Sequence, residues 1–434
     1  MKKISFTISI VLIVLLTGCT QNSDNTAKNF TMNFLRNYIR GTGYAILQLD
    51  DSVTYQEING DETIVFENIN TSRGTVIVIQ DYFRYWNGEH RIDINVNIDV
   101  PLREWYLKGY NYPDGSVGEI DVTLDFTGNP EDYEGMLISP SNYGIIFANF
   151  IISDFQGDIY HLDEDEDISF FSSIYNPDTD IAFCDWIIGE SFVQNEVNEF
   201  YLELDKPMLA KTISVNRPIT SSKIHAFRNG MLDSNLMHFN SFYDNPVTEF
   251  TGFYNDDFPH NMFSIYVNNY NGTEFYRFDN ISDEIPSILD IPMSSISAVF
   301  DVDNNKFTEI LVDGSVDQIS ASWTQSDSEK FVSLNVYSIT NVEEILLPEI
   351  PSEILEQLDI DLSLFTLNDI SIVDYDTANN SDDIINLEFQ QQTPLISLYN
   401  QKYNYTRFID AETLHRERNN RYRDEENRPT LEKW

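Results

Sequence analysis

Hydrophobic and polar residues alternate along much of this chain with a period of two, the period of a β-strand that buries one face. The clearest example is residues 91–100, where isoleucine or valine takes every second position and charged or amide residues stand between them. Residues 119–126 repeat the pattern, with Ile120 leading the apolar set and Glu119 leading the polar set. Each segment predicts a strand with one face on a core and the other in water.

Further segments have the length and composition of strands. They are residues 75–80, 144–152, 200–204, 262–267, 295–302, 307–312, 318–323, 331–337, 362–372 and 384–389. Dipeptides that tolerate the positive φ of a tight hairpin stand between strands, namely Asn59-Gly60, Asn87-Gly88, Asp114-Gly115, Asn229-Gly230, Asn271-Gly272 and Asp313-Gly314. Short strands at this spacing predict an all-β protein built from two or three β-sandwich modules.

Two segments depart from the period of two. Residues 30–40 predict a brief helix with Phe34 on its apolar side. Residues 410–426 are charged and free of glycine and proline, which predicts a short C-terminal helix. Pro348 and Pro351 interrupt regular pairing and indicate a module boundary between the last two β-rich regions.

The N-terminus has the features of an export signal. Lys2 and Lys3 precede an apolar run over residues 4–16 that only hydroxyl residues interrupt. A helix over this run would span roughly 20 Å at ~1.5 Å per residue, which is short of the ~30 Å hydrocarbon core of a bilayer. The segment therefore predicts a removable signal peptide and disfavours a permanent transmembrane helix.

Leu16-Thr17-Gly18-Cys19 closes that run and resembles the lipobox of bacterial lipoproteins, in which an aliphatic residue and two small residues precede a cysteine. The resemblance implies that the lipoprotein signal peptidase recognises Leu16, Thr17 and Gly18. It also implies that Cys19 accepts a diacylglyceryl group on its sulfur and becomes the mature N-terminus. Two or three acyl chains hold a protein stably on a bilayer, so the expected partner is membrane lipid. The alternative is an ordinary secretory signal with an incidental cysteine.

The residue after this cysteine bears on location. Thr20 stands where lipoproteins retained in the inner membrane carry aspartate, so the resemblance implies a protein anchored outside the cytoplasm, and on the outer membrane in a Gram-negative host. Residues 20–29 are polar and predict a flexible tether between the anchor and the folded body.

Charge excludes one class of partner. The chain has 71 acidic and 26 basic residues, a formal net charge of −45. Such a field repels phosphate backbones, so we expect no nucleic-acid binding. The excess of carboxylates is explained either by solubility in a salty habitat, where screening weakens self-repulsion, or by cation binding.

The first part of the body carries a second resemblance. Its sequence runs through SVT at residues 52–54, NGDETIVFENI at residues 59–69 and TVIVI at residues 75–79. This succession resembles the prealbumin-like or carboxypeptidase-regulatory-like sandwiches of bacterial surface proteins, in which a strand, a glycine turn and a second strand ending in asparagine precede the next strand. The resemblance implies a fold and no catalytic residues.

These boundaries give an expected domain order. It comprises a lipoprotein signal peptide (residues 1–18), a lipidated tether (19–42), a prealbumin-like β-sandwich module (43–130), one or more β-rich domains (131–346), a β-rich C-terminal module (347–409) and a charged helical tail (410–434).

Alternating carboxylates supply the one candidate metal site. Asp163, Asp165 and Asp167 could place three hard oxygen ligands around Ca²⁺. Asp301 begins a similar triplet, but Lys306 stands where a calcium-binding EF-hand loop needs glycine. A solvated loop and a hairpin tip are the favoured explanations of these clusters, with Ca²⁺ binding as the alternative, and no other cofactor is expected.

Nucleophile and zinc patterns give no site. Once Cys19 is acylated only Cys184 remains, in an apolar setting that predicts a buried, inert thiol. The histidines have no zinc-binding spacing, and Ser191 lacks the second glycine of a nucleophile elbow. No catalytic residue is assigned.

Three functional classes remain open. The first is a non-enzymatic, membrane-anchored surface or envelope lipoprotein whose all-β body binds a partner. The second is a Ca²⁺-dependent or glycan-binding β-sandwich module, for which the many aromatic residues could stack on sugars. The third is a hydrolase, whose acidic residues the sequence does not locate.

Overall fold

The computed structural model describes residues 28–35, 38–39, 41–50, 52–83, 88–108, 118–129, 133–138, 145–146, 154–159, 168–176, 178–191, 193, 196–227, 235–260, 262–301, 304–326, 330–338, 342–376, 378, 383–384 and 401–408. Strands make up most of these residues, so the protein is all-β as predicted.

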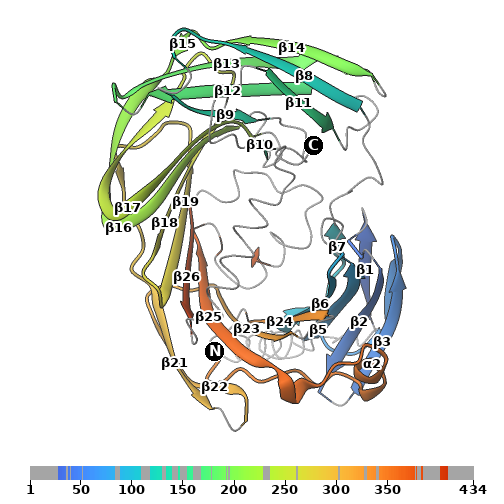
Figure 1. Ribbon diagram of the computed structural model, residues 1–434. Coiled ribbons are helices and arrows are strands. Elements are labelled where there is room, and N and C mark those ends of the chain that lie inside the picture. The colour runs from blue at the N-terminus through green and yellow to red at the C-terminus, as the bar shows by residue number, and fades with distance from the viewer. Residues whose placement is uncertain are drawn as a thin grey trace, which may run out of the picture.

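One large, curved sheet of 13 strands runs through the molecule (Figure 1). Its order is β17-β16-β18-β19-β26-β25-β23-β24-β6-β5-β2-β3, and β20 pairs with β16. The bounds are β2 Thr42–Leu49, β3 Ser52–Asn59, β5 Arg73–Phe83, β6 His90–Pro101, β16 Leu209–Phe227, β17 Asn235–Tyr254, β18 Met262–Tyr270, β19 Glu274–Ser282, β20 Ile288–Leu289, β23 Gln318–Ser326, β24 Lys330–Ser338, β25 Thr366–Tyr375 and β26 Gln401–Phe408. Neighbours pair antiparallel except β24 with β6 and β20 with β16.

Smaller sheets and two short helices complete the described chain. One sheet has the order β4-β1-β7 (β1 Lys28–Leu35, β4 Thr63–Ile69, β7 Trp105–Lys108), and another has the order β11-β8-β14 (β8 Gly118–Asp125, β11 Asp154–Ile159, β14 Val197–Glu203). A third has the order β10-β9-β12-β13-β15 (β9 Glu134–Ile138, β10 Ile145–Ile146, β12 Ile168–Asn176, β13 Ile181–Glu190, β15 Lys206–Pro207). A hairpin joins β21 Ser295–Asp301 to β22 Lys306–Asp313, and the helices are α2 Ser352–Gln357 and η3 Leu362–Leu364.

Sheet-on-sheet packing forms the cores. The largest core lies on the convex side of the large sheet, where β12, β13, the β21–β22 hairpin and α2 cover it (Figure 1). A second core joins the β4-β1-β7 sheet to the other face of β2 and β5, and a third joins β8 and β14 to β12. Strands β2 and β5 are therefore covered on both faces, as is the end of β6 at Val100, whereas the described residues form a core on only one face of the strands from β24 to β19.

The alternation that predicted individual strands is confirmed where one face is covered. In β6 the side chains of Ile92, Ile94 and Val96 are buried, and Asp93 and Asn95 between them are half-buried. Four of the predicted hairpin glycines, Gly60, Gly88, Gly272 and Gly314, have the expected positive φ, and Gly115 and Gly230 lie outside the described residues. Gly60, for example, has a φ of 82°, and a Cβ atom added to it would meet no atom within 4 Å. The backbone conformation, and not a lack of space, therefore requires glycine there.

The helix predicted over residues 30–40 is wrong. Residues 28–35 form strand β1, which pairs antiparallel with β4 and parallel with β7. Phe30, Met32 and Phe34 are all fully buried, because a period of two brings them to the same face of the strand. The apolar positions fit both periods over so short a segment, and packing against the second core selects the strand.

The large sheet draws strands from all three β-rich segments of the expected domain order. Strand β6 from the first segment pairs with β24 of the second, which continues through β23 to β25 of the third. The boundaries near residues 130 and 346 therefore do not divide this sheet. The C-terminal helix expected over residues 410–426 lies outside the described residues. Among the helices described here, none is long and apolar enough to cross a membrane.

Candidate functional site

The concave face of the large sheet carries polar and aromatic side chains where its convex face carries the core. On β23, Ile319, Ala321 and Trp323 point into the core, and Ser320 and Ser322 point the other way. Because residues paired across neighbouring strands share a face, this second set continues from strand to strand. We call the resulting surface, from β6 through β24, β23, β25 and β26 to β19, the polar face.

Cross-strand hydrogen bonds organise the first row of the polar face. Asp369 of β25, Ser322 of β23, Asn335 of β24 and Asn95 of β6 are successive partners across the sheet. The Ser322 hydroxyl donates to Asp369 Oδ2 at 2.6 Å, and Asn335 Nδ2 donates to Asn95 Oδ1 at 3.4 Å. The row fixes hydroxyl and amide groups at the spacing of the strands, roughly 4.8 Å.

The second row runs parallel to the first and ends in aromatic rings. Its members are Phe275 of β19, Thr406 of β26, Ser371 of β25, Ser320 of β23 and Tyr337 of β24. The hydroxyls of Ser320 and Ser371 lie 2.6 Å apart. Aromatic rings therefore bracket a stretch of small hydroxyl side chains.

A cavity of about 570 Å³ lies over these two rows. The charged side chains among its lining residues are Arg91, Lys402 and Asp369. The Arg91 guanidinium lies 5.0 Å from the centre of the Phe331 ring and 2.7 Å from Asp93, and the Lys402 ammonium lies 4.9 Å from the Tyr375 ring. The lining combines many neutral polar groups with few charges.

Residues behind the polar face hold β19 and β26 in place. Arg217 stacks 4.0 Å above the Tyr276 ring and donates through Nη1 to the Tyr403 hydroxyl at 2.8 Å. Burial raises the pKa of Tyr276 to about 12, so this phenol stays neutral beside the guanidinium. The contacts of Arg217 with Tyr276 and Tyr403 therefore support the two strands that carry Phe275 and Asn404.

Two asparagines that line the cavity have polar atoms with no hydrogen-bond partner among the described residues. They are Asn368, through Nδ2, and Asn404, through Oδ1. Leaving a buried polar atom unpaired costs about 1–3 kcal/mol, so such atoms are uncommon away from sites that a ligand or water completes.

A second hollow, of about 690 Å³, lies over the segment from Glu284 to Asp290, which includes β20. Its lining also includes Lys211, whose ammonium is already bound to the Ile285 carbonyl, and Asn280, whose Oδ1 lacks a partner in this described part of the chain. This hollow has neither the hydroxyl rows nor the flanking aromatic rings of the polar face, so the polar face is the stronger candidate.

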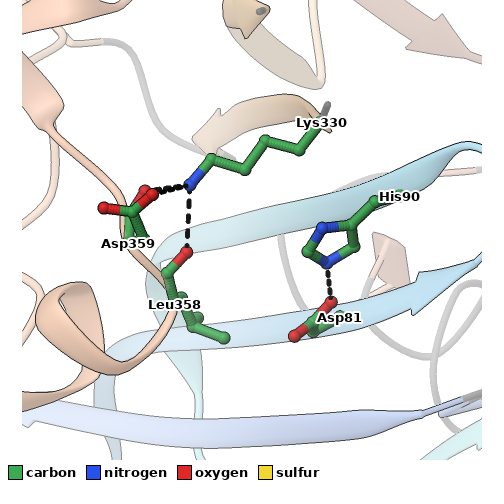
Figure 2. Close-up of polar contacts among 5 residues, drawn as sticks. All are labelled: Asp81, His90, Lys330, Leu358 and Asp359. Carbon is green, nitrogen blue, oxygen red and sulfur yellow. Dashed lines mark hydrogen bonds and ion pairs between the residues drawn. The ribbon is translucent and has the colours of Figure 1, made fainter. Parts of the chain in front are cut away.

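Charged groups at the end of β5 and β6 have structural roles (Figure 2). His90 Nε2 lies 2.6 Å from Asp81 Oδ1, and the Phe83 ring stacks on the imidazole at 4.8 Å. The nearly buried Lys330 ammonium donates to the Leu358 carbonyl at 3.3 Å, to the Asp359 carboxylate at 3.0 Å and to the Asp359 carbonyl. These contacts connect strands to one another and to the segment after α2.

The residues predicted for lipidation and for calcium lie outside the described chain. These are Leu16, Thr17, Gly18 and Cys19, and the triplet Asp163, Asp165 and Asp167. Both sites stay predictions. Within the described ranges, His, Cys, Asp and Glu side chains form no group of three or more that could hold a metal ion.

Residues from the other sequence patterns are structural. Asn305, from the triplet that begins at Asp301, donates to the Phe365 carbonyl at 3.0 Å and accepts from Trp323 Nε1 at 3.1 Å, so its amide serves the fold. Cys184 is fully buried, as its apolar setting predicted, and burial raises the pKa of its thiol to about 12.

Sequence reasoning did not identify the polar face. A signal for it exists in the water-facing positions of the predicted strands. Those of β8 are largely acidic (Glu119, Asp121, Asp125), whereas those of β23 are neutral and mostly hydroxyl residues, although the chain as a whole is strongly acidic. The change from carboxylates to neutral hydroxyls marks strands with a different surface role.

Comparison with known proteins adds no family to this description: no protein-family model matches the chain, and no curated protein matches it.

Proposed function

We propose that this protein is a membrane-anchored lipoprotein of the cell envelope whose β-rich body binds carbohydrate without modifying it. The anchor is the lipobox Leu16-Thr17-Gly18-Cys19, and the binding surface is the polar face. Acyl chains on Cys19 would keep the body outside the cytoplasm, where envelope and extracellular glycans are present.

The observation that carries the binding function is the pair of hydroxyl and amide rows bracketed by aromatic rings. Sugars present hydroxyls around their edges and C–H groups on their faces. Serine, threonine and asparagine side chains match the edges by hydrogen bonding, and rings such as Tyr337 and Phe275 match the faces by stacking. Binding sites of this kind combine apolar walls with a few fixed polar groups.

Affinity electrophoresis tests the binding function. The purified full-length protein is run through gels that contain dextran, laminarin, xylan or alginate. We expect at least one polysaccharide to retard the protein and its Tyr201→Ala variant, and to retard Tyr337→Ala much less. Tyr201 is a suitable control because it is 55% exposed on β14, in a different sheet. Unchanged migration in every gel, or equal retardation of both variants, would contradict carbohydrate binding at this face.

The anchor is tested separately with Cys19→Ser. Cells that produce either protein are grown with labelled fatty acid and then fractionated. The wild-type chain should incorporate label and sediment with membranes, and the variant should do neither. A variant that still incorporates label would refute lipidation at Cys19.

A further inference from the structure

A β-bulge interrupts the polar face at Asn368. Ser322 of β23 pairs with Asp369 of β25, but the next residue, Trp323, pairs with Leu367, so Asn368 has no partner in the ladder. A bulge inserts one extra residue into a strand and turns its side chain out of the regular alternation. Here the extra residue lies in the middle of the large sheet, and its side chain reaches the lining of the cavity.

The amide of Asn368 is buried, and one of its two polar atoms has a partner. The residue is 2% exposed, and the Thr324 hydroxyl donates to its Oδ1 at 3.0 Å. In that orientation Nδ2 is left as a donor, and none of the described residues accepts from it. A buried donor with no acceptor in the described chain calls for an acceptor supplied by water or by a bound molecule.

Asn404 supplies the complementary group further along the same cavity. Its Oδ1 is a buried acceptor with no donor in the described chain, and Asn404 pairs with Val373, five residues beyond Asn368 on β25. Five residues of strand span roughly 17 Å at ~3.4 Å per residue. A ligand that satisfies both amides must therefore be longer than one sugar ring.

The chemistry of the two asparagines selects hydroxyl groups over charged groups at these two positions. Carboxylate or phosphate oxygens could accept from Asn368, but they offer no donor to Asn404, and the Asp369 carboxylate next to Asn368 would repel them. An ammonium group would satisfy Asn404 but not Asn368, and Arg91 and Lys402 line the cavity. Hydroxyl groups donate and accept, so they satisfy both ends.

We propose, building on the carbohydrate-binding function above, that the ligand is a neutral oligosaccharide several sugars long, lying along β25 from Asn368 to Asn404. Asn368 is its specificity-determining residue. The Asn368 amide donates to a sugar hydroxyl, and the bulge turns that amide toward the cavity.

Calorimetric titration of the full-length protein tests this proposal. The probes are glucose, three neutral hexasaccharides (maltohexaose, cellohexaose and laminarihexaose) and hexagalacturonate. We expect a neutral hexasaccharide to bind at least tenfold more tightly than glucose and than hexagalacturonate. Asn368→Asp, which keeps the size of the side chain and replaces the donor by an acceptor, should lose about tenfold or more in affinity for that hexasaccharide.

Asn59→Asp is the matched control, because it adds the same charge at an exposed hairpin where Asp-Gly and Asn-Gly are both favourable. It should bind as the wild type does. If Asn368→Asp fails to fold, Asn368→Ala replaces it, and the preference of the wild type for neutral probes is measured without any variant.

Two outcomes overturn the inference while carbohydrate binding stands: equal or tighter binding of hexagalacturonate, or unchanged affinity of a folded Asn368 variant. If no probe binds, and no polysaccharide retards the protein in the gels described above, carbohydrate binding itself is refuted.

Discussion

Replacing Lys330 by methionine should destabilise the protein through the segment that follows α2. The Lys330 side chain is 9% exposed, and its ammonium donates to the carbonyls of Leu358 and Asp359 and to the Asp359 carboxylate (Figure 2). Leu358 is the C-cap of α2, and Asp359 follows it with a φ of 52°. Lys330 therefore places a positive charge at the C-terminal end of this helix, where unpaired carbonyls and the helix dipole favour one.

The expected size of the effect follows from which contacts are desolvated. The Asp359 side chain is 98% exposed, so its ion pair with Lys330 contributes little. The two carbonyls lose a charged donor, and a hydrogen bond to a charged group contributes about 1.5–3 kcal/mol. Methionine offsets part of this lost stabilisation, because burying its apolar side chain does not require the desolvation of an ammonium group. We expect Lys330→Met to lower the free energy of unfolding by about 2–3 kcal/mol.

Urea unfolding, followed by tryptophan fluorescence and circular dichroism, measures this loss. Lys306→Met is the matched control, since Lys306 pairs with Glu344 at 2.9 Å in a more exposed setting (24% and 49%) and should change stability little. Asp359→Asn should also have a small effect, because asparagine tolerates positive φ and keeps the backbone carbonyl. Equal unfolding midpoints for Lys330→Met and Lys306→Met would refute the argument from buried carbonyls.

Three further predictions concern single groups. Burial, aided by Lys223 and Arg277, lowers the pKa of His225 to about 3 from an ordinary value near 6.5. Between these two pH values the unfolded chain binds a proton that the native protein does not, so the free energy of unfolding falls as pH drops from about 6.5 towards 3. His225→Gln should weaken this fall, measured as the difference between urea midpoints at pH 7 and pH 4.5. Cys184 should react with a thiol reagent at pH 8 only under unfolding conditions, and rapid reaction of the native protein would contradict its burial. If Asp163, Asp165 and Asp167 bind Ca²⁺ in the native state, a hundredfold excess over Kd adds about 2.7 kcal/mol, and equal melting temperatures in chelator and in millimolar Ca²⁺ would rule out a useful site.

Sequence alternation located strands that bury one face but gives no signal for strands that bury both: β5 was predicted from its length and composition, and β2 was not predicted. Strands β6 and β8 were predicted because water-facing residues mark every second position. In β2, by contrast, Tyr44 and Ile46 join the convex core, and Ala45 and Leu47 join the core beneath β1. A strand covered on both sides has no polar period, so its composition cannot distinguish it from a buried helix.

Strand neighbours were beyond prediction for a different reason. The period of two decides which residues share a face, but it carries no information on which strand lies alongside. Ser333 of β24 bonds Asp93 of β6 across 240 residues of sequence, in a parallel pair. Forming such a pair closes a long loop at a cost in conformational entropy, and only the contacts of the complete sheet offset that cost. The spacing of strands along the sequence predicted that the chain divides into successive sandwich modules. The large sheet instead joins strands from the three β-rich segments.

The polar face was hidden by the same rule that found its strands. An alternating polar residue is assigned to water, and Ser320, Ser322 and Thr324 fit that assignment as well as the carboxylates of β8 do. Their role becomes visible only when six strands align their rows. The bulge at Asn368 is less visible still, because it depends on a mismatch between two strands that have no sequence signal for their pairing.

The charge of the whole protein and the chemistry of the polar face support the same class of ligand. A formal net charge of −45 repels anionic polysaccharides over the range of the Debye length, roughly 8–10 Å at physiological salt. Within the cavity the described lining has Arg91 and Lys402 against Asp369, so the strong acidic excess of the chain lies elsewhere. A neutral oligosaccharide is neither attracted nor repelled by the outer field, so the binding we propose at the hydroxyl rows should not depend on ionic strength. We expect this protein to stand on an envelope surface, where the salt concentration varies. The negative charge of the protein would change its affinity for a charged ligand as salt varies, but it would leave its affinity for an uncharged ligand unchanged.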